Sequence, residues 1–166
     1  MPSPKQSILD NIVTTLQGIT VAGGYYTDIQ QVVKGKIVSV TKIPPAWRSA
    51  YCCAVFANQT NARTGTDIAQ AEAEYSVYCA MDNVTSLNFM NFLDDIEASL
   101  AKSPVRNEVA GAAFNVLDSY VVNVTTFDTE EIDEMLSSGD EQYRVREAIL
   151  TLSVSYTYSA IGLSGD

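Results

Sequence analysis

The chain contains no histidine. This absence excludes a Ser-His-Asp triad, a Cys-His nucleophile pair and any metal site built on imidazole ligands. Cysteine is also scarce, because Cys52, Cys53 and Cys79 are the only three. An odd count with two adjacent thiols fits neither a disulfide framework nor a CxxC metal site, since neighbouring strand residues point to opposite faces. We therefore expect three buried, reduced thiols in apolar strands.

Motifs that bind phosphate groups or calcium are absent as well. The chain has neither GxxxxGKS/T nor GxGxxG, and its acidic residues lack the spacing and central glycine of an EF-hand. No apolar run approaches the roughly 18 to 20 residues of a membrane helix. The first residues, MPSPKQS, have neither the basic nor the apolar region of a secretory signal. We therefore expect a soluble protein made in the cytoplasm.

Basic residues are few: 10, against 20 acidic ones, which gives a formal net charge of −10. Such a surface repels nucleic acid rather than gripping its phosphates. The excess is local, because seven acids and no base lie between Asp128 and Glu141. We interpret residues 128–141 as an acidic loop inserted in the fold. It either faces a partner or an acidic channel, or is simply solvated, or binds calcium or magnesium.

Carboxylates and tyrosines remain as candidates for acid–base chemistry. Asp94, Asp95 and Glu97 fall, at helical spacing, on the side away from an apolar stripe, so we expect a solvated helix face. The nine tyrosines are typical of half-buried sheet residues where they alternate in strands. We therefore predict that the protein is not an enzyme. We assign it no catalytic, cofactor-binding or metal-binding residue.

Two amphipathic helices are predicted. The first covers residues 4–17, with Ser3 as its N-cap, Pro4 at its first position and Gly18 as its stop. The second begins at Thr85 or Ser86 and ends before Pro104. The apolar stripes consist of Ile8, Ile12, Leu16 and Ile19 in the first helix and of Phe89, Phe92, Leu93, Ile96 and Leu100 in the second.

Strand patterns fill most of the remaining sequence. The predicted strands are residues 25–33, 36–43, 51–57, 71–83, 119–127 and 142–159. In the last of these, apolar residues from Ala148 to Tyr156 alternate with polar ones, and Ile149 is the one exception. The polar residues 58–67 predict a mobile loop. Residues 107–119 fit either a loop or a short strand, and 160–166 form a flexible tail.

The element order predicts one domain over residues 1–166. Strands joined by short polar loops favour antiparallel pairing, and two amphipathic helices can cover one face of the resulting sheet. The expected fold class is α+β: a two-layer sandwich of a mostly antiparallel sheet with two helices packed on one face.

Trp47 is the only tryptophan, and it stands between Pro44–Pro45 and Arg48. A tryptophan at the end of a loop often closes a core. Tryptophan and arginine are also enriched at protein interfaces. Trp47 and Arg48 are therefore candidates either for a core plug or for an interface anchor.

Several stretches, taken in order, resemble one protein family. They are an amphipathic first helix, GGYYTDIQQV, IPPAW, AVFA, AEAEYSVYCAMDN, LNFMNFLDDIEASL and VREAILTLSVSYTY. Over roughly residues 8–158 the chain is similar to the tail terminator proteins of long-tailed bacteriophages, also described as tail completion or head–tail joining proteins.

This resemblance implies a structural virion protein. Proteins of this kind form a six-membered ring on the last ring of the tail tube, stop its growth and offer their other face to the head connector. The implied partners are copies of the chain itself, the tail tube protein and a connector or neck protein, while DNA passes through the lumen without sequence-specific binding. The implied location is the tail–neck junction of the virion, after synthesis in the host bacterial cytoplasm, with no membrane contact.

A cyclic ring needs head-to-tail contacts between its subunits. The sequence suggests two sets of candidates for contacts with neighbouring subunits or other partners, the tryptophan pair and the acidic loop. The residues are Trp47, Arg48, Asp128, Glu130, Glu131, Asp133 and Glu134.

Three alternatives remain open at this point. One is another phage neck or minor tail protein, such as a head–tail adaptor. The second is a non-viral cytosolic α+β binding module, which would be a stable monomer with a ligand cleft. The third is an enzyme that uses only carboxylates or tyrosines.

Overall fold

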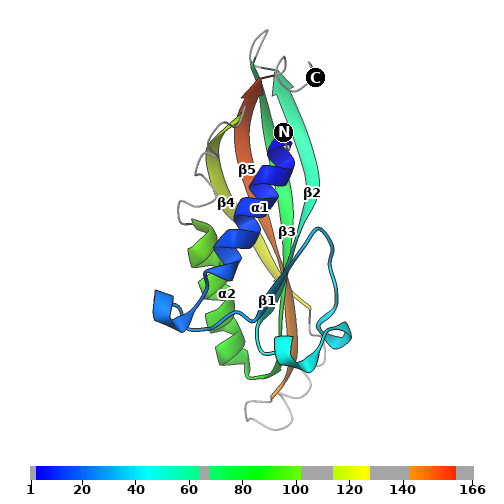
Figure 1. Ribbon diagram of the computed structural model, residues 1–166, viewed down its shortest axis with the longest axis vertical. Helices are drawn as coiled ribbons and strands as arrows, with labels where there is room; N and C mark the ends of the chain where they lie inside the picture. Colours follow the sequence, from blue (N-terminus) through cyan, green and yellow to red (C-terminus); the bar gives the residue numbers. More distant parts are fainter. Residues whose placement is uncertain (1–2, 64–67, 102–113, 128–142, 160–166) are drawn as a thin grey trace.

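The structure is a computed structural model that describes residues 3–63, 68–101, 114–127 and 143–159 (Figure 1). Two helices and five strands make up the described part. In chain order they are α1 (Pro4–Gln17), β1 (Gln31–Lys34), β2 (Tyr51–Arg63), β3 (Ile68–Val84), α2 (Ser86–Ala101), β4 (Phe114–Thr126) and β5 (Arg144–Ser159). Short 3₁₀ turns lie at Val21–Gly23, Val40–Lys42 and Pro45–Trp47.

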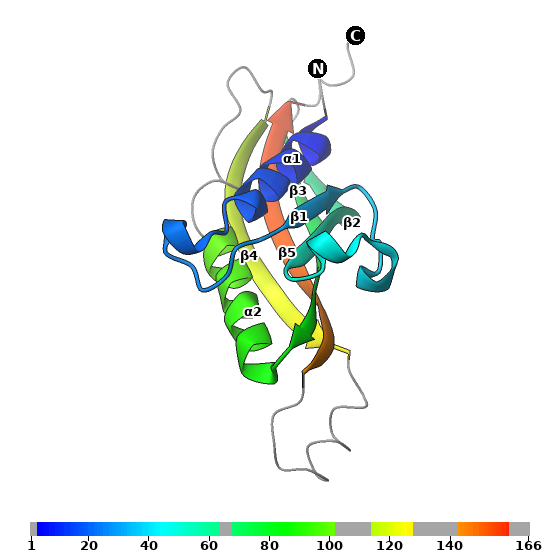
Figure 2. The same cartoon turned by 60° about the horizontal axis from the view of Figure 1, so that its bottom comes forward.

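The strands form one sheet with the order β1-β2-β3-β5-β4. The β2–β3, β3–β5 and β4–β5 pairs are antiparallel, and only the short β1 runs parallel to its neighbour β2. Both helices pack on the same side of this sheet (Figure 2). The predicted α+β sandwich, with a mostly antiparallel sheet and two helices on one face, is therefore confirmed.

The main core lies between the two helices and the sheet. Alternate residues of β3 and β5 point into it, as the period of two requires. Its largest fully buried side chains are Tyr75, Tyr156, Phe92, Ile8, Ile12, Leu16, Ile19, Ile96, Leu100, Leu150 and Leu152. The Tyr75 hydroxyl donates a 2.8 Å hydrogen bond to the carbonyl of Lys5, which ties β3 to the first turn of α1.

Both helices begin where the sequence predicts. The Ser3 hydroxyl accepts a 3.2 Å hydrogen bond from the Gln6 backbone N–H, and the Thr85 hydroxyl accepts one of 3.3 Å from the Asn88 N–H. These side chains satisfy donors that have no partner inside the helix. Residue 104, the predicted stop of the second helix, lies outside the described residues, and α2 extends to Ala101.

A smaller cluster on the opposite face of the sheet corrects one strand prediction. Residues 36–43 do not form a strand, although they are rich in β-branched side chains. Instead Val40 and Ile43 cover Tyr51, Cys53, Tyr78 and Ala80, and we call these six residues the second cluster. Gly35, at φ +87°, turns the chain out of β1 so that this segment crosses the sheet face. Ile149, the exception in the β5 pattern, packs against the second cluster.

Two further strand boundaries differ from the predictions. Residues 58–63 belong to β2 and do not form a mobile loop, because each of them pairs with a residue of β3. The register shifts between Phe56 and Asn58, and beyond this bulge the backbone of residues 58–63 continues the ladder with β3. The predicted strand 25–33 is reduced to β1, since residues 25–30 follow an irregular path in which the Gln30 N–H donates to the Ala50 carbonyl.

The strands that flank the acidic loop in the sequence also have bounds that differ from the predicted ones. β4 begins at Phe114, so that part of the ambiguous stretch 107–119 is strand, and β5 begins at Arg144. The acidic loop 128–141 and the tail 160–166 lie outside the described residues, as do residues 64–67 of the predicted polar loop.

The expectation of a solvated acidic face on the second helix is wrong for one residue. Asp94 and Glu97 are exposed, but Asp95 is only 3% exposed. Both of its carboxylate oxygens accept hydrogen bonds from the backbone N–H of Tyr26, at 3.0 and 3.1 Å. Asp95 therefore anchors the irregular segment before β1 to the middle of α2.

Candidate assembly surfaces

Residues 36–43, which cross the sheet face and contribute Val40 and Ile43 to the second cluster, are called the covering segment. Trp47 and Arg48 follow this segment along the chain. Trp47 is partly buried and packs against this cluster. The Arg48 guanidinium donates to the carbonyls of Ile43 and Thr41, at 3.0 and 3.2 Å, and the Arg48 carbonyl accepts a 2.7 Å bond from the Asp82 N–H. These contacts favour the core-plug reading of Trp47. A role for the pair in an interface remains a prediction.

The other predicted interface residues belong to the acidic loop. Asp128, Glu130, Glu131, Asp133 and Glu134 lie outside the described residues. Their contact role therefore also remains a prediction.

A buried polar contact holds the covering segment on the sheet. The Tyr78 hydroxyl donates a 2.5 Å hydrogen bond to the Glu147 carboxylate and accepts one of 3.2 Å from the Val40 N–H. Burial is the main cause that raises the pKa of Tyr78 above its ordinary value, and the bond to Glu147 adds to it. The hydroxyl is therefore a neutral donor that links β3, β5 and the covering segment, and not a base.

We expect the substitution Tyr78→Phe to lower the free energy of unfolding by about 1 to 3 kcal/mol. The change leaves the buried Val40 N–H and the partly buried Glu147 carboxylate without this partner. Chemical denaturation measures the difference. Tyr143→Phe is the matched control, because that side chain is 68% exposed, and it should stay within about 0.5 kcal/mol of the parent. Equal effects of the two substitutions would contradict the anchoring role.

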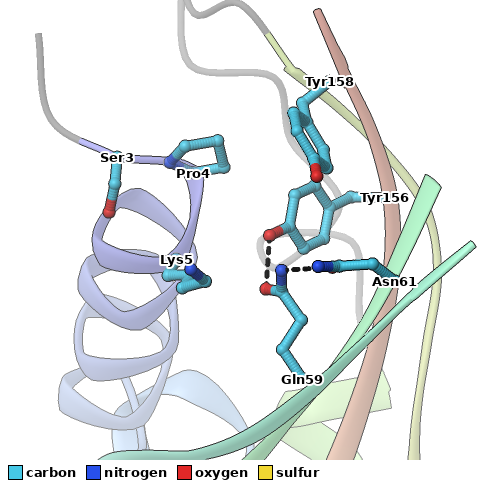
Figure 3. Close-up of a pocket in the computed structure, with 7 residues that line it drawn as sticks. All are labelled: Ser3, Pro4, Lys5, Gln59, Asn61, Tyr156 and Tyr158. Carbon is cyan, nitrogen blue, oxygen red and sulfur yellow. Dashed lines mark hydrogen bonds between the residues drawn. The ribbon is translucent and has the colours of Figure 1, made fainter. Parts of the chain in front are cut away.

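A pocket of about 300 Å³ opens between the start of α1 and the ends of β2 and β5 (Figure 3). Three of its polar side chains are hydrogen-bonded in a row: the Tyr156 hydroxyl donates to Gln59, whose side-chain amide donates to Asn61, both at 2.6 Å. Burial raises the pKa of Tyr156 to about 12, so this hydroxyl stays protonated at neutral pH. Among the described lining residues, this chain of hydrogen bonds links β5 to β2.

The three thiols are buried, as the sequence predicts, and free. Burial raises the pKa of Cys52 and of Cys79, which keeps both protonated and unreactive. Within the described ranges, no three thiol or carboxylate side chains gather closely enough to hold a metal ion. Neither described helix has the length and apolar character of a bilayer-crossing helix.

Two long strand edges of the sheet have no described strand beside them. No described strand pairs with the outer side of β4, which we call the β4 edge. β1 covers β2 only over residues 51–54, so the outer side of residues 55–63 also has no described strand beside it. We call this part the β2 edge. Figure 1 shows β4 and β2 on opposite margins of the sheet.

The β4 edge carries large apolar side chains. Leu117, Tyr120 and Val122 are each 49% exposed. Leu117 and Val122 lie at two register shifts of the β4–β5 pair, where one residue of β4 has no partner. Sequence reasoning missed this surface. The adjacent apolar residues Val121 and Val122 break the alternation of the strand, and this break was the available signal.

The open face of the long strands is acidic and rich in hydroxyl groups. Beyond the second cluster, the register places Glu72 and Glu74 of β3 on this face, beside Ser153 of β5 and Asp118 of β4. The Ser153 hydroxyl donates a 2.8 Å hydrogen bond to Glu72. Among the strand residues whose side chains the structure describes, no lysine or arginine points to this face.

The comparisons with known proteins show a likeness of fold. No protein-family model matches the sequence, and no curated protein matches it. Among solved structures, a chain in the virion of a native gene transfer agent (GTA) particle is similar, with a TM-score of 0.56 and 10% sequence identity. The match covers 94% of this chain and 99% of that chain. The two chains therefore share one fold over nearly their whole lengths.

Proposed function

We propose that the protein is a structural component of a phage-like virion, and that its role is that of a tail terminator. The observation that carries this proposal is the fold shared with a virion chain across 94% of the sequence. A shared fold alone does not fix function. The proposal therefore also uses the resemblance of the sequence to tail terminators and the two surfaces described above.

The proposed assembly is a ring of six copies that caps the tail tube and ends its growth. One face of the ring binds the tail tube protein and the other binds the head connector. A cyclic ring is built from heterologous contacts, in which one surface of a subunit meets a different surface of the next. The β4 edge and the β2 edge lie on opposite margins of the sheet and so support such an arrangement.

The charge of the chain supports a lumen through which DNA passes. A channel that must release DNA should not hold its phosphates, and holding them requires lysine or arginine. The net charge is −10, and the open sheet face carries Glu72, Glu74 and Asp118. In this proposal the open face is turned to the lumen, and the protein has no catalytic activity and no cofactor.

Native mass spectrometry across concentration, with negative-stain images, tests the ring. Six chains of 18.0 kDa give 6 × 18.0 = 108 kDa, and we expect a closed species of this mass with a centre open enough for duplex DNA. A protein that stays monomeric at every concentration and also on isolated tail tubes would contradict the proposal and favour an α+β binding module. Immunogold labelling of particles separates the terminator from another neck protein, since only the former ends the tube at the tail–neck junction.

A further inference from the structure

We propose that the ring contact is a strand-to-strand junction, in which the β4 edge of one copy pairs antiparallel with the β2 edge of the next. The partner at each edge is thus a second copy of this chain. This inference rests on the proposed function for the closed ring, and it names the surfaces that close it. Four features of the sheet support it: strand direction, level, the position of β1 and the chemistry of the edges.

Strand direction makes the two edges compatible. The four long strands alternate in direction across the sheet, from β2 through β3 and β5 to β4. When a second copy is set beside the first in the same orientation, its β2 runs opposite to the adjacent β4. The alternation therefore continues from one copy into the next. Antiparallel pairs are the commoner kind in sheets.

The two edges also match in their positions along the strand direction, which we call their level. Asn58 of β2 pairs with Glu74 of β3. Glu74 pairs with Ser153 of β5, and Ser153 pairs with Tyr120 of β4. Asn58 and Tyr120 therefore lie in one row, at opposite margins of the same sheet. Two copies side by side without stagger place Tyr120 of one against Asn58 of the other.

The position of β1 marks where the junction ends. Ala54 is the last residue of β2 that β1 covers, and the register places Ala54 level with Val124. Leu117 and Val122 lie on the other side of that limit, level with the uncovered part of β2. Leu117 and Val122 of β4 thus lie level with the part of β2 that has no described strand on its outer side.

The chemistry of the edges fits a covered interface. Free edges in soluble proteins are usually guarded by lysine, proline or inward charges. β4 has neither lysine nor proline, and Asp118 is its one charged residue. On the β2 edge, Phe56 is 40% exposed and stands near the level of Val122. In the proposed junction the register shifts divide the ladder into short stretches, and the exposed side chains of Leu117 and Val122 pack between these stretches.

A cross-linking experiment tests the junction directly. The double variant Asn58→Cys/Tyr120→Cys carries one thiol on each edge, and both positions are exposed and on the open face. A bismaleimide with a reach of about 7 Å tolerates two residues of stagger at about 3.4 Å each. The native thiols are buried and react slowly by comparison. We expect covalent products that form a ladder from two chains to six.

Matched variants make the result specific. Each single variant should give almost no product, and a mixture of the two should stop at dimers, because each chain then carries one edge thiol. The pair Asn88→Cys/Ala98→Cys, exposed on α2, gives the background for two thiols per chain. Efficient dimers from Tyr120→Cys alone would show that two β4 edges meet each other, and this would overturn the head-to-tail junction.

A second set of variants tests the same contact without cross-linking. Val122→Lys and Leu117→Lys place guarding charges on the β4 edge at half-exposed positions. We expect the ring and the ladder to disappear while the circular dichroism spectrum is unchanged. Leu87→Lys, at a 62% exposed site on α2, is the control and should retain both.

The outcomes separate this inference from the proposed function. A 108 kDa ring without a ladder above background would overturn the edge junction and leave the ring in place. A ladder from open chains, with no closed species, would support the junction and count against the ring. The absence of a ladder at millimolar chain concentration would overturn the junction in either case.

Discussion

The substitution Asp95→Ala is expected to lower the free energy of unfolding by about 2 to 3 kcal/mol. Asp95 is buried at the middle of α2, and both of its oxygens accept from the Tyr26 N–H. Hydrogen bonds to charged groups contribute more than neutral ones, and removal of a buried acceptor leaves the donor unpaired. The lost contact joins residues 69 positions apart, so its removal also frees the segment before β1. Urea denaturation followed by circular dichroism measures the change.

Two neighbouring substitutions control this prediction. Asp94→Ala removes an exposed carboxylate from the same helix and should change stability by less than about 0.5 kcal/mol. Asp95→Asn keeps one oxygen acceptor, so its loss of free energy of unfolding should lie between the losses caused by Asp94→Ala and Asp95→Ala. If Asp94→Ala and Asp95→Ala had the same effect, the carboxylate would not be the anchor that the geometry indicates.

The parts of the fold with a strict period could be predicted from the sequence. The apolar stripe of α1 and the capping residue Ser3 give its bounds. The alternation in β5 identifies which residues enter the core, because a half-buried strand has one apolar face. These patterns are local, and they are consistent with the tertiary packing.

The parts that could not be predicted depend on contacts between distant residues. Residues 36–43 have strand-forming side chains, but Val40 and Ile43 pack into the second cluster, so this segment covers the sheet face instead of joining the sheet as a strand. Residues 58–63 are polar, but β3 provides their backbone partners. The burial of Asp95 depends on a loop far away in sequence. In each case tertiary context overrides local propensity.

The candidate assembly surface shows the same division. Trp47 and Arg48 stand out in the sequence by residue type, yet their contacts lie mostly within their own loop and cluster. The β4 edge has no rare residue, and it becomes visible only when the strand order places β4 at a margin. An interface built from backbone edges depends on topology, and residue type alone does not reveal it.

Alkaline pH is expected to unfold the protein cooperatively, with most of the stability lost between about pH 10 and pH 12. The cause is a set of buried tyrosines, Tyr51, Tyr75, Tyr78 and Tyr156, whose side chains are at most 2% exposed. Burial is the main cause that raises the pKa of each of the four, and for Tyr156 the value is about 12. In the unfolded chain these phenols titrate near a pKa of about 10.

The sign of the effect follows from the protons that each state binds. Below about pH 10 both states hold the phenolic protons, and the contribution of these groups to stability is complete. Above that pH the unfolded chain releases protons that the folded chain keeps. Each such tyrosine then lowers the free energy of unfolding by at most about 1.4 kcal/mol per pH unit. Four together approach about 5 kcal/mol per unit, against a typical domain stability of about 5 to 15 kcal/mol.

Circular dichroism and tyrosinate absorbance, recorded together against pH, test this expectation. Part of the absorbance should develop only as the helical signal is lost, because those phenols ionise after the chain unfolds. Tyr75→Phe removes one phenol from the set, so the number of protons released on unfolding above about pH 10, measured from the slope of stability against pH, should fall by about one. The burial of Cys52 and Cys79, which raises the pKa of both thiols, acts in the same direction from about pH 8.5. Complete tyrosinate formation in a chain that keeps its circular dichroism would show that the four hydroxyls are open to solvent, against the packing of β2, β3 and β5 described above.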